Sequence, residues 1–326
     1  MNEMQKIHEN SPDDRHNESG LTSTPGAPEI AVIILTYRQK EQTLRCLRHL
    51  LPLDSVGPNF RVLLWDNGSN DDTAHAVSME FPPVQVHVNT SNLGVAGGRN
   101  AAAAEAIRRW RPEFLLFLDN DMVVEPGFVA ALWQPFQGVT GASLGQTQAK
   151  LRLAEHPDLL NDGGGCRIQF WLGRTRPVGY GEVDKGQYDT PTRCVSCGGA
   201  MMVRSALFQE LGGFDELFNP FGPEDLDFSL RLQESGWESW YIPDAVAYHD
   251  VTHTFGGGEY TEEYAAYRSR HWLRLMRRHA RVGDWIGFVL IGMPIIAGRV
   301  IGRELRRGNL GALRGLIRGA LGHHRK

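Results

Sequence analysis

Two pairs of acidic residues have types and spacings that suit metal and proton chemistry. Asp119 and Asp121 stand two residues apart, directly after the apolar run 114–118. Carboxylates at this spacing can share a divalent ion, and their hard oxygen atoms favour Mg²⁺ or Mn²⁺. Such an ion can bridge a diphosphate and stabilise the charge that develops as it leaves. The same residues also suit a solvated turn, so the motif alone leaves both interpretations open.

Glu224 and Asp225 form the second pair, with Asp227 two residues further on. A carboxylate beside a like charge has a raised pKa, which favours proton acceptance near neutral pH. Either acid could therefore serve as a general base, and the residues alone do not separate the two. The alternative is that these acids occupy the first turn of a helix and complement its dipole.

The elements that must position these acids alternate along the chain. Four segments have the apolar pattern of strands, with helical spacing between them: residues 30–36, 61–66, 84–88 and 114–118. This order predicts an α/β fold with a mostly parallel sheet and helices on both faces. Ligands bind beyond the carboxyl ends of such strands, where Thr36, Tyr37 and Asp66 join Asp119 and Asp121.

The rest of the chain is harder to interpret. Glycine and proline are frequent between 141 and 200, so only short strands are expected there, and two short closing strands are predicted at 240–242 and 246–248. Residues 1–28 are polar and are predicted to form a disordered leader without a signal peptide. Cys194 and Cys197 lack a second metal-binding pair, which favours reduced cysteines in a cytosolic protein over a zinc site.

The C-terminal segment 264–326 is strongly basic. It holds 14 Lys and Arg against two acidic residues, in a chain of net charge −4. Such a segment favours contact with an anionic membrane surface, and its composition argues against nucleic acid. The uncharged stretch 285–298 contains Pro294 and falls short of the roughly 20 residues that cross a bilayer. We therefore predict an interfacial anchor; a helical hairpin packed on the body or on a second subunit is the alternative.

Six segments resemble motifs of family 2 glycosyltransferases. Four are similar to the donor-binding half of that family and two to its acceptor half: residues 35–38, 66–73, 92–100, 118–121, 212–216 and 223–232. The likeness covers about residues 30–280 and is greatest to bacterial rhamnosyltransferase-type enzymes that build cell-surface glycans. It implies a GT-A fold, a Rossmann-like and mostly parallel sheet with helices on both faces, here with a C-terminal helical appendage.

The resemblance also implies a domain plan and a set of residues near the donor. It divides the chain into a nucleotide-sugar-binding half at 29–125, an acceptor half at 126–263 and a tail at 264–326. The residues near the donor would be Thr36, Tyr37, Asp66, Gly94, Arg99, Asn100 and Asp119. Among them Asp66 would bind the nucleotide base and Asp119 the ribose or the sugar. Gly94 would permit close approach of the backbone.

Metal and proton roles follow from the same likeness. Asp121 would hold Mg²⁺ or Mn²⁺, and His249 matches a position that often supplies a further metal ligand or a diphosphate contact, with His253 as a rival. Asp225 would be the general base, and Glu224 is the alternative. Inversion at the anomeric carbon needs only this one base. The Gln-x-x-Arg-Trp signature of processive synthases is absent, which favours transfer of one sugar per encounter.

The expected partners are small molecules and a membrane. A base-binding aspartate suits the imide N–H of uracil or thymine, so a UDP- or dTDP-sugar is expected rather than a GDP-sugar. A saccharide or lipid-linked acceptor would fit a cytoplasmic enzyme held peripherally on the inner face of the plasma membrane. A nucleotidyltransferase would need a glycine-rich loop after strand 30–36, where this chain has no glycine. A non-catalytic sugar-nucleotide binder could lack Asp121 or Asp225, yet both are present.

Overall fold

The structure is a computed structural model that describes residues 29–52, 57–138, 143–196, 198–251, 261–307 and 310–322. The leader predicted at 1–28, Cys197 and the rival ligand His253 lie outside these residues. The three cysteines within them are free thiols: Cys46, Cys166 and Cys194.

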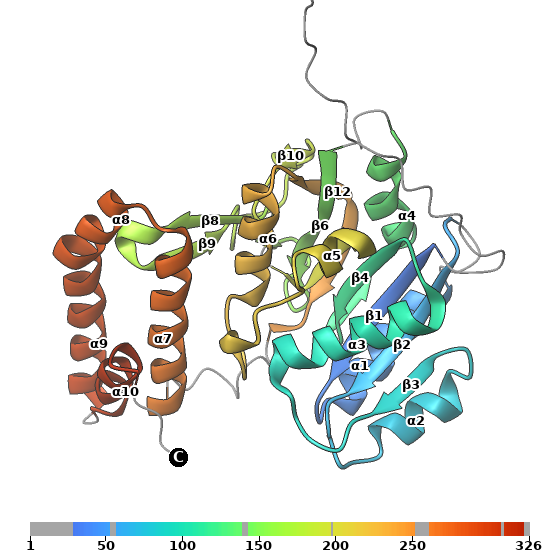
Figure 1. The fold of residues 1–326 in the computed structure, drawn as a ribbon, viewed down its shortest axis with the longest axis horizontal. Coiled ribbons are helices and arrows are strands. Elements are labelled where there is room, and N and C mark those ends of the chain that lie inside the picture. The colour runs from blue at the N-terminus through green and yellow to red at the C-terminus, as the bar shows by residue number, and fades with distance from the viewer. Residues whose placement is uncertain are drawn as a thin grey trace, which may run out of the picture.

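The first half alternates strands and helices as predicted (Figure 1). Its elements are β1 (Ile30–Thr36), α1 (Lys40–Leu50), β2 (Phe60–Asp66), α2 (Thr73–Glu80), β3 (Gln85–Val88), α3 (Gly94–Trp110) and β4 (Phe114–Asp119). The four strands pair in parallel, in the spatial order β4-β1-β2-β3. Strands that are covered on both faces have continuous apolar sequences. The strands of this half could therefore be predicted from the sequence.

Alternate side chains of β1 enter two separate cores. Ile30, Val32 and Ile34 pack in the layer that holds α1 and α2. Ala31 and Ile33 pack on the other face, against apolar residues of α3, of α5 (Ser205–Glu210) and of α6 (Glu224–Glu234). The sheet therefore has helices on both faces, and the carboxyl ends of its parallel strands meet at one edge.

The second half extends the same sheet with mixed strands. Its other elements are β5 (Met122–Val124), α4 (Phe128–Trp133), η2 (Gln134–Gln137), β6 (Leu144–Leu153), β7 (Leu160–Asp162), β8 (Cys166–Gln169), η4 (Phe170–Leu172), β9 (Arg174–Pro177), β10 (Thr192–Arg193), β11 (Ala200–Arg204), η5 (Glu216–Phe218) and β12 (Glu238–His249). β11 runs antiparallel to β4 and joins the two halves, while β8 and β9 form a separate two-stranded sheet.

Two strand predictions in this half were wrong. β6 has ten residues where only short strands were expected, because its polar residues interrupt the apolar pattern. Gln146 and Gln148 are fully buried, and buried Lys150 pairs with Asp184 at 3.1 Å between Nζ and Oδ2. The segments 240–242 and 246–248 belong to one strand, β12, whose register with β6 shifts between them.

The C-terminal helices form a group beside β8 and β9, at the end of the molecule away from α2 and β3 (Figure 1). They are α7 (Glu262–His279), α8 (Val282–Gly287), the π-helical turn η7 (Phe288–Gly292), α9 (Met293–Arg307) and α10 (Gly311–Ala320). α10 lies directly on α7. The helices approach so closely that a β-carbon on Gly315 would overlap the carbonyl oxygen of Glu262, and one on Gly319 would overlap that of Ala266. Small residues allow two helix backbones to approach this closely.

The apolar part of this tail is longer than predicted. Residues Val282–Arg303 form one continuous helical stretch of 22 residues, long and apolar enough by length and composition to cross a membrane. The sequence-based estimate took only the uncharged stretch 285–298, which Pro294 interrupts; proline lacks an N–H and its ring clashes with the preceding helical turn. Pro294 is the second residue of α9, which begins directly after η7, and a π turn is a place where a helix absorbs such an interruption.

Two sets of contacts hold the C-terminal helices against the rest of the protein. Buried Asp227 of α6 pairs with Arg278 at 2.6 Å and with His279 at 3.0 Å, both at the end of α7. In the second set, the turn between η4 and β9 packs tightly against η7, where a β-carbon on Gly173 would come within 2.6 Å of the ring of Phe288. The tail is thus attached both to the helix that carries the second acidic pair and to the β8–β9 sheet.

Candidate active site

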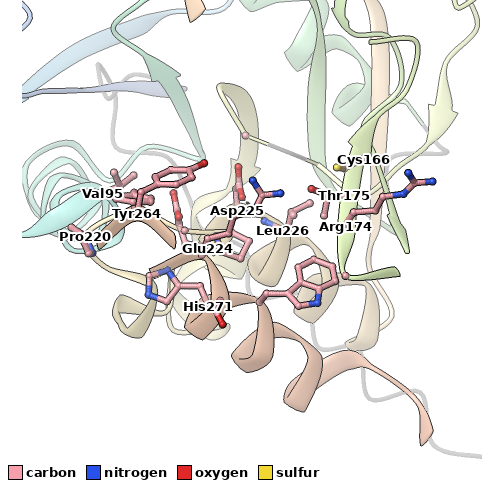
Figure 2. A pocket seen from close by; sticks show the side chains of 18 of the residues that line it. Val95, Cys166, Arg174, Thr175, Pro220, Glu224, Asp225, Leu226, Tyr264 and His271 are labelled. Atoms are coloured by element: carbon pink, nitrogen blue, oxygen red, sulfur yellow. Dashed lines mark hydrogen bonds between the residues drawn. The ribbon is translucent and has the colours of Figure 1, made fainter. Parts of the chain in front are cut away.

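A cavity of about 1500 Å³ lies beyond the carboxyl ends of β1 and β4 and reaches the start of α6. Nine of the eleven predicted site residues line it: Thr36, Tyr37, Gly94, Arg99, Asp119, Asp121, Glu224, Asp225 and His249. Figure 2 shows Glu224 and Asp225 in its wall, between Tyr264 on one side and Arg174 and Thr175 on the other. The fold therefore brings the two acidic pairs to one cavity, although a hundred residues separate them in sequence.

Arg99 links the two acidic pairs. One guanidinium nitrogen is hydrogen-bonded to Asp119 Oδ1, and the other donates to Glu224 Oε1 at 3.0 Å. Burial of Arg99 removes its charge from water, and the hydrogen bonds to Asp119 and Glu224 replace the lost hydration. The resemblance placed Arg99 near the donor; its nitrogens are directed at protein acids, and it holds the end of β4 against the start of α6.

The two acids of α6 differ in their surroundings. Glu224 is buried, with one oxygen on Arg99 and the other, Oε2, without a hydrogen-bond partner in the part of the chain that the structure describes. Asp225 accepts a hydrogen bond from the backbone N–H of Leu226 at 2.7 Å and lines the cavity. Desolvation raises the pKa of both carboxyl groups, and the charge of Asp225 raises that of Glu224 further. Asp225 is therefore the acid that more readily gives up its proton near neutral pH.

Gly198, which the sequence analysis did not single out, makes room for Asp225. Its φ is +79°, and a β-carbon there would overlap the Asp225 carboxylate. The adjacent Gly199 has a φ of +77°, and its carbonyl accepts a hydrogen bond from the N–H of Asp119 at 2.8 Å. This pair of glycines in a left-handed conformation thus shapes the wall between the two acidic pairs, and the Gly-Gly doublet was a signal that could have been used.

Asp121 and His249 form a second polar pair in the cavity. Asp121 is buried, its Oδ1 has no hydrogen-bond partner among the described residues, and its Oδ2 lies 3.5 Å from His249 Nε2. His249 Nδ1 lies 3.0 Å from Asn161 Oδ1, so Asn161 orients the ring. Burial alone would lower the pKa of His249, but the hydrogen bond and charge of Asp121 outweigh it and raise the pKa.

These two side chains fit a divalent cation. A buried carboxylate oxygen without a partner is costly unless a ligand satisfies it, and a cation would do so for Asp121 Oδ1. Within the described residues, no group of three or more His, Cys, Asp or Glu side chains is arranged to hold a metal ion. Asp119, the other acid of the motif, is turned to Arg99. Mg²⁺ and Mn²⁺ sites often take only one or two protein ligands and complete their shell with phosphate and water.

The remaining donor-side residues divide into cavity walls and supports. Thr36 lies in the wall, but its hydroxyl is 2.9 Å from that of Thr43. Tyr37 is partly exposed at the rim, with the Arg38 guanidinium 5.0 Å from the centre of its ring. Asp66 is buried and does not line the cavity; its carboxylate accepts a hydrogen bond from the Ser69 N–H at 2.8 Å and shapes the turn after β2. Its binding of the base remains a prediction.

Gly94 and Asn100 contact other parts of the protein. A β-carbon on Gly94 would overlap the side chain of Asn219, whose Oδ1 accepts from the N–H of Ala96 at 3.1 Å. The space left by this glycine is filled by an asparagine that the sequence did not single out, and the role of Gly94 beside the donor remains a prediction. The Asn100 amide exchanges two 2.9 Å hydrogen bonds with the backbone of Phe214 and lies outside the cavity wall.

Comparisons with known proteins place this geometry in context. The family model described as Glycosyltransferase like family 2 matches residues 27–281. The chain is 27% identical over 272 residues to the N-acetylglucosaminyl-diphospho-decaprenol L-rhamnosyltransferase of Mycobacterium tuberculosis, covering 78% of this chain and 86% of that protein. It is 28% identical over 239 residues to an N-acetylglucosaminyltransferase of Azorhizobium caulinodans, covering 70% of this chain and 57% of that protein.

Two solved structures share the fold at low sequence identity. GalNAc-T7 with UDP, GalNAc and Mn²⁺ has a TM-score of 0.59 at 15% identity, covering 78% of this chain and about half, 48%, of that one. A mannosyltransferase from Pyrobaculum calidifontis with GDP-Man and Mn²⁺ has a TM-score of 0.54 at 16% identity, covering 93% of this chain and 82% of that one. Likeness at this identity concerns the architecture of the chain, not its ligands.

Proposed function

This chain belongs to glycosyltransferase family 2 and has the GT-A fold, and from that premise we propose that it transfers one sugar per encounter, with inversion, from a nucleoside-diphosphate sugar to an acceptor hydroxyl. The observation that best supports the proposal is that one cavity is lined both by a carboxylate suited to proton removal and by a separate Asp–His pair suited to a metal ion. Each group supplies a different half of the reaction, and the cavity is large enough for both substrates.

Asp225 acts on the acceptor in this proposal. It takes the proton from the acceptor hydroxyl while that oxygen forms its bond to the anomeric carbon, and the bond from that carbon to the diphosphate oxygen breaks. A single displacement of this kind inverts the anomeric centre and leaves the proton on Asp225 and the negative charge on the nucleoside diphosphate. Arg99 holds Glu224 in place through its 3.0 Å hydrogen bond, so that the neighbouring Asp225 is fixed at the start of α6.

Asp121 and His249 serve the donor. They would hold Mg²⁺ or Mn²⁺, which when bound would stabilise the charge on the departing diphosphate. Asn161 orients His249 from behind, and Asp119, held by Arg99, is left to contact the ribose or the sugar. Thr36, Tyr37 and Asp66, at the ends of β1 and β2, are assigned to the nucleotide end of the donor.

The donor is tested by nucleoside diphosphate release. We expect release from UDP- or dTDP-sugars but not from GDP-sugars, with Mn²⁺ present and not with EDTA, because an aspartate accepts the imide N–H of uracil or thymine. Calorimetric titration of UDP, dTDP and GDP gives the same ranking without an acceptor. Tighter binding of GDP would refute the pyrimidine assignment, and binding without any turnover on saccharide and lipid-linked acceptors would indicate a non-catalytic sugar-nucleotide binder.

We further propose that the enzyme builds cell-surface glycan at the cytoplasmic face of the plasma membrane, with its C-terminal helices in contact with the bilayer. The relative from Mycobacterium tuberculosis is named for a lipid-linked acceptor. In this chain, Ile286, Leu290 and Ile291 are exposed on α8 and η7, and Arg299 and Arg306 follow on α9. Apolar side chains followed by cations suit the boundary between acyl chains and anionic headgroups. One face of the same helical stretch packs against Gly173 through Phe288. A position at the membrane interface therefore fits better than a helix that crosses the bilayer.

Membrane contact is expected to depend on that exposed face. The double variant Ile286→Glu and Leu290→Glu should bind vesicles containing anionic lipid at least about tenfold more weakly, because two exposed apolar side chains are lost. Vesicle flotation measures this, and the matched control is Met79→Glu with Val88→Glu, which changes exposed apolar residues on α2 and β3. Deletion of 282–326 should release the protein as well. Equal losses in the control, or a truncated protein that still floats, would refute this anchor.

A further inference from the structure

The cavity continues beyond the acids, over apolar side chains of the C-terminal helices. Met293, Ile296 and Val300 of α9 and Leu313, Leu316 and Ile317 of α10 line the same cavity as Glu224 and Asp225. Met293 and Ile317 are 47% and 54% exposed, so this apolar part opens at the surface and is not an internal void. We refer to these six residues as the apolar groove.

Arginines from three elements line the cavity together with these apolar residues. Arg174 comes from β9, Arg268 from α7, and Arg299 and Arg303 from α9. Arg299 and Arg303 share α9 with the apolar groove, while Arg268 lies one turn along α7 from Tyr264, a neighbour of the acids in Figure 2. One cavity thus combines an acidic catalytic end, cationic side chains and an apolar wall.

We propose that the apolar groove binds the isoprenoid chain of a prenyl-diphosphate-linked acceptor, whose diphosphate is bound by the arginines and whose sugar hydroxyl reaches Asp225. This inference rests on the proposed function and names the acceptor class. An acceptor of this kind carries a sugar, an anionic diphosphate and an apolar chain in one molecule, and each finds a complementary wall in this cavity. A free saccharide or a polar glycan has no apolar chain and would not require the apolar groove.

Tight packing between helices fixes the shape of the groove. The glycines of α10 place that helix directly on the backbone of α7, at Glu262 and Ala266. On the other side, Gly173 fits against both Phe288 and Ile296, at 2.6 and 2.7 Å from a β-carbon built there. A preformed apolar wall binds without the cost of ordering it.

The groove also adjoins the face assigned to the membrane. Leu290 and Leu321 are 69% and 66% exposed on the same helical group but do not line the cavity. An isoprenoid chain could therefore pass from the bilayer along α9 and α10 into the cavity without crossing a polar surface. The diphosphate of the acceptor would then lie at the level of the lipid headgroups, a region in which arginine side chains are stable.

The experiment uses the full-length protein and a water-soluble probe, farnesyl diphosphate, with inorganic diphosphate as the comparison. Calorimetry in EDTA prevents a metal from drawing either anion to Asp121. We expect the wild type to bind farnesyl diphosphate at least tenfold more tightly than inorganic diphosphate. Met293→Gln with Ile317→Gln should remove about tenfold of that affinity, and the control Met79→Gln with Val88→Gln, at exposed apolar residues outside the cavity, should stay within twofold.

The outcomes separate this inference from the function on which it rests. Equal binding of both anions to the wild type, or an equal loss in the control pair, overturns the groove assignment. Nucleotide-sugar binding with Mn²⁺ is measured on the same variants; its retention shows that they fold and that the donor site is intact. If no nucleotide sugar binds to any of them, the proposed function fails, whereas a missing dependence on the prenyl chain with intact donor binding refutes only the groove.

Discussion

Asp225→Asn is expected to lower the rate of sugar transfer by about 10³-fold while nucleotide-sugar binding changes by less than about twofold, because a positioned general base contributes roughly 10²- to 10⁴-fold. Asparagine keeps the shape of the side chain and its hydrogen bond from the Leu226 N–H but cannot take a proton. The measurement is kcat for transfer at saturating donor and acceptor, with donor affinity determined separately by calorimetry.

Glu224→Gln is the control for this assignment. Its oxygen would still accept from Arg99, so we expect a much smaller loss of kcat than in Asp225→Asn. The opposite ranking would make Glu224 the base. Gly198→Ala displaces the Asp225 carboxylate without altering its chemistry, and a large loss of kcat with normal donor affinity would support the same placement.

The pH profile gives a further test of the base. Burial raises the pKa of Asp225 above its ordinary value, to about 6. A base works only when deprotonated, so transfer should be high above this pKa and should fall as the pH drops through about 6. In Asp225→Asn the remaining activity should lack this step; a step that persists unchanged would assign it to another group.

Asp121→Asn is expected to reduce transfer by about 10³-fold and to abolish its dependence on Mn²⁺, because a metal ion supplies several kcal/mol to the leaving diphosphate and each 1.36 kcal/mol is a factor of ten. The substitution keeps the size of the side chain but removes the charge that a divalent cation requires. Binding of Mn²⁺ itself, followed by electron paramagnetic resonance in the presence of the nucleoside diphosphate, gives a readout that does not depend on turnover.

A matched control for this prediction lies on the strand that carries His249. Asp244 is exposed on β12 and does not line the cavity, so Asp244→Asn should leave both Mn²⁺ binding and transfer unchanged. Asn161→Ala removes the partner of His249 Nδ1 and should weaken Mn²⁺ binding, by less than Asp121→Asn does. Full activity of Asp121→Asn in EDTA would show that the reaction needs no metal.

Local sequence patterns predicted the first half of the fold and the identity of its acids. Continuous apolar runs between helical segments predicted β1, β2 and β4, because strands buried on both faces need apolar side chains at every position. The polar residues at the ends of these strands marked one edge of the sheet, and the later acidic pair at 224–225 was visible as a motif. Such signals are local, so a single sequence carries them.

The contacts between these residues form only when the chain folds. Arg99 and Glu224 are 125 positions apart, and their hydrogen bond depends on the path of the chain between them. The same is true of Asn219 beneath Gly94 and of Gly198 beneath Asp225, which no local pattern connects. β6 escaped prediction because it carries polar residues into the core, where Lys150, for example, pairs with Asp184 from elsewhere in the chain.

In the tail, too, some features could be predicted from the sequence and others depend on the folded structure. Its charge and apolar content predicted a membrane surface, but the continuity of the helix through Pro294 and the extension of the cavity along α9 and α10 emerged only from packing. Hydrophobic periodicity and strand-end residues depend on near neighbours in sequence, so the sequence contains them. Ion pairs, glycine contacts and cavity walls are set by segments that meet only after folding, so the tertiary structure alone decides them.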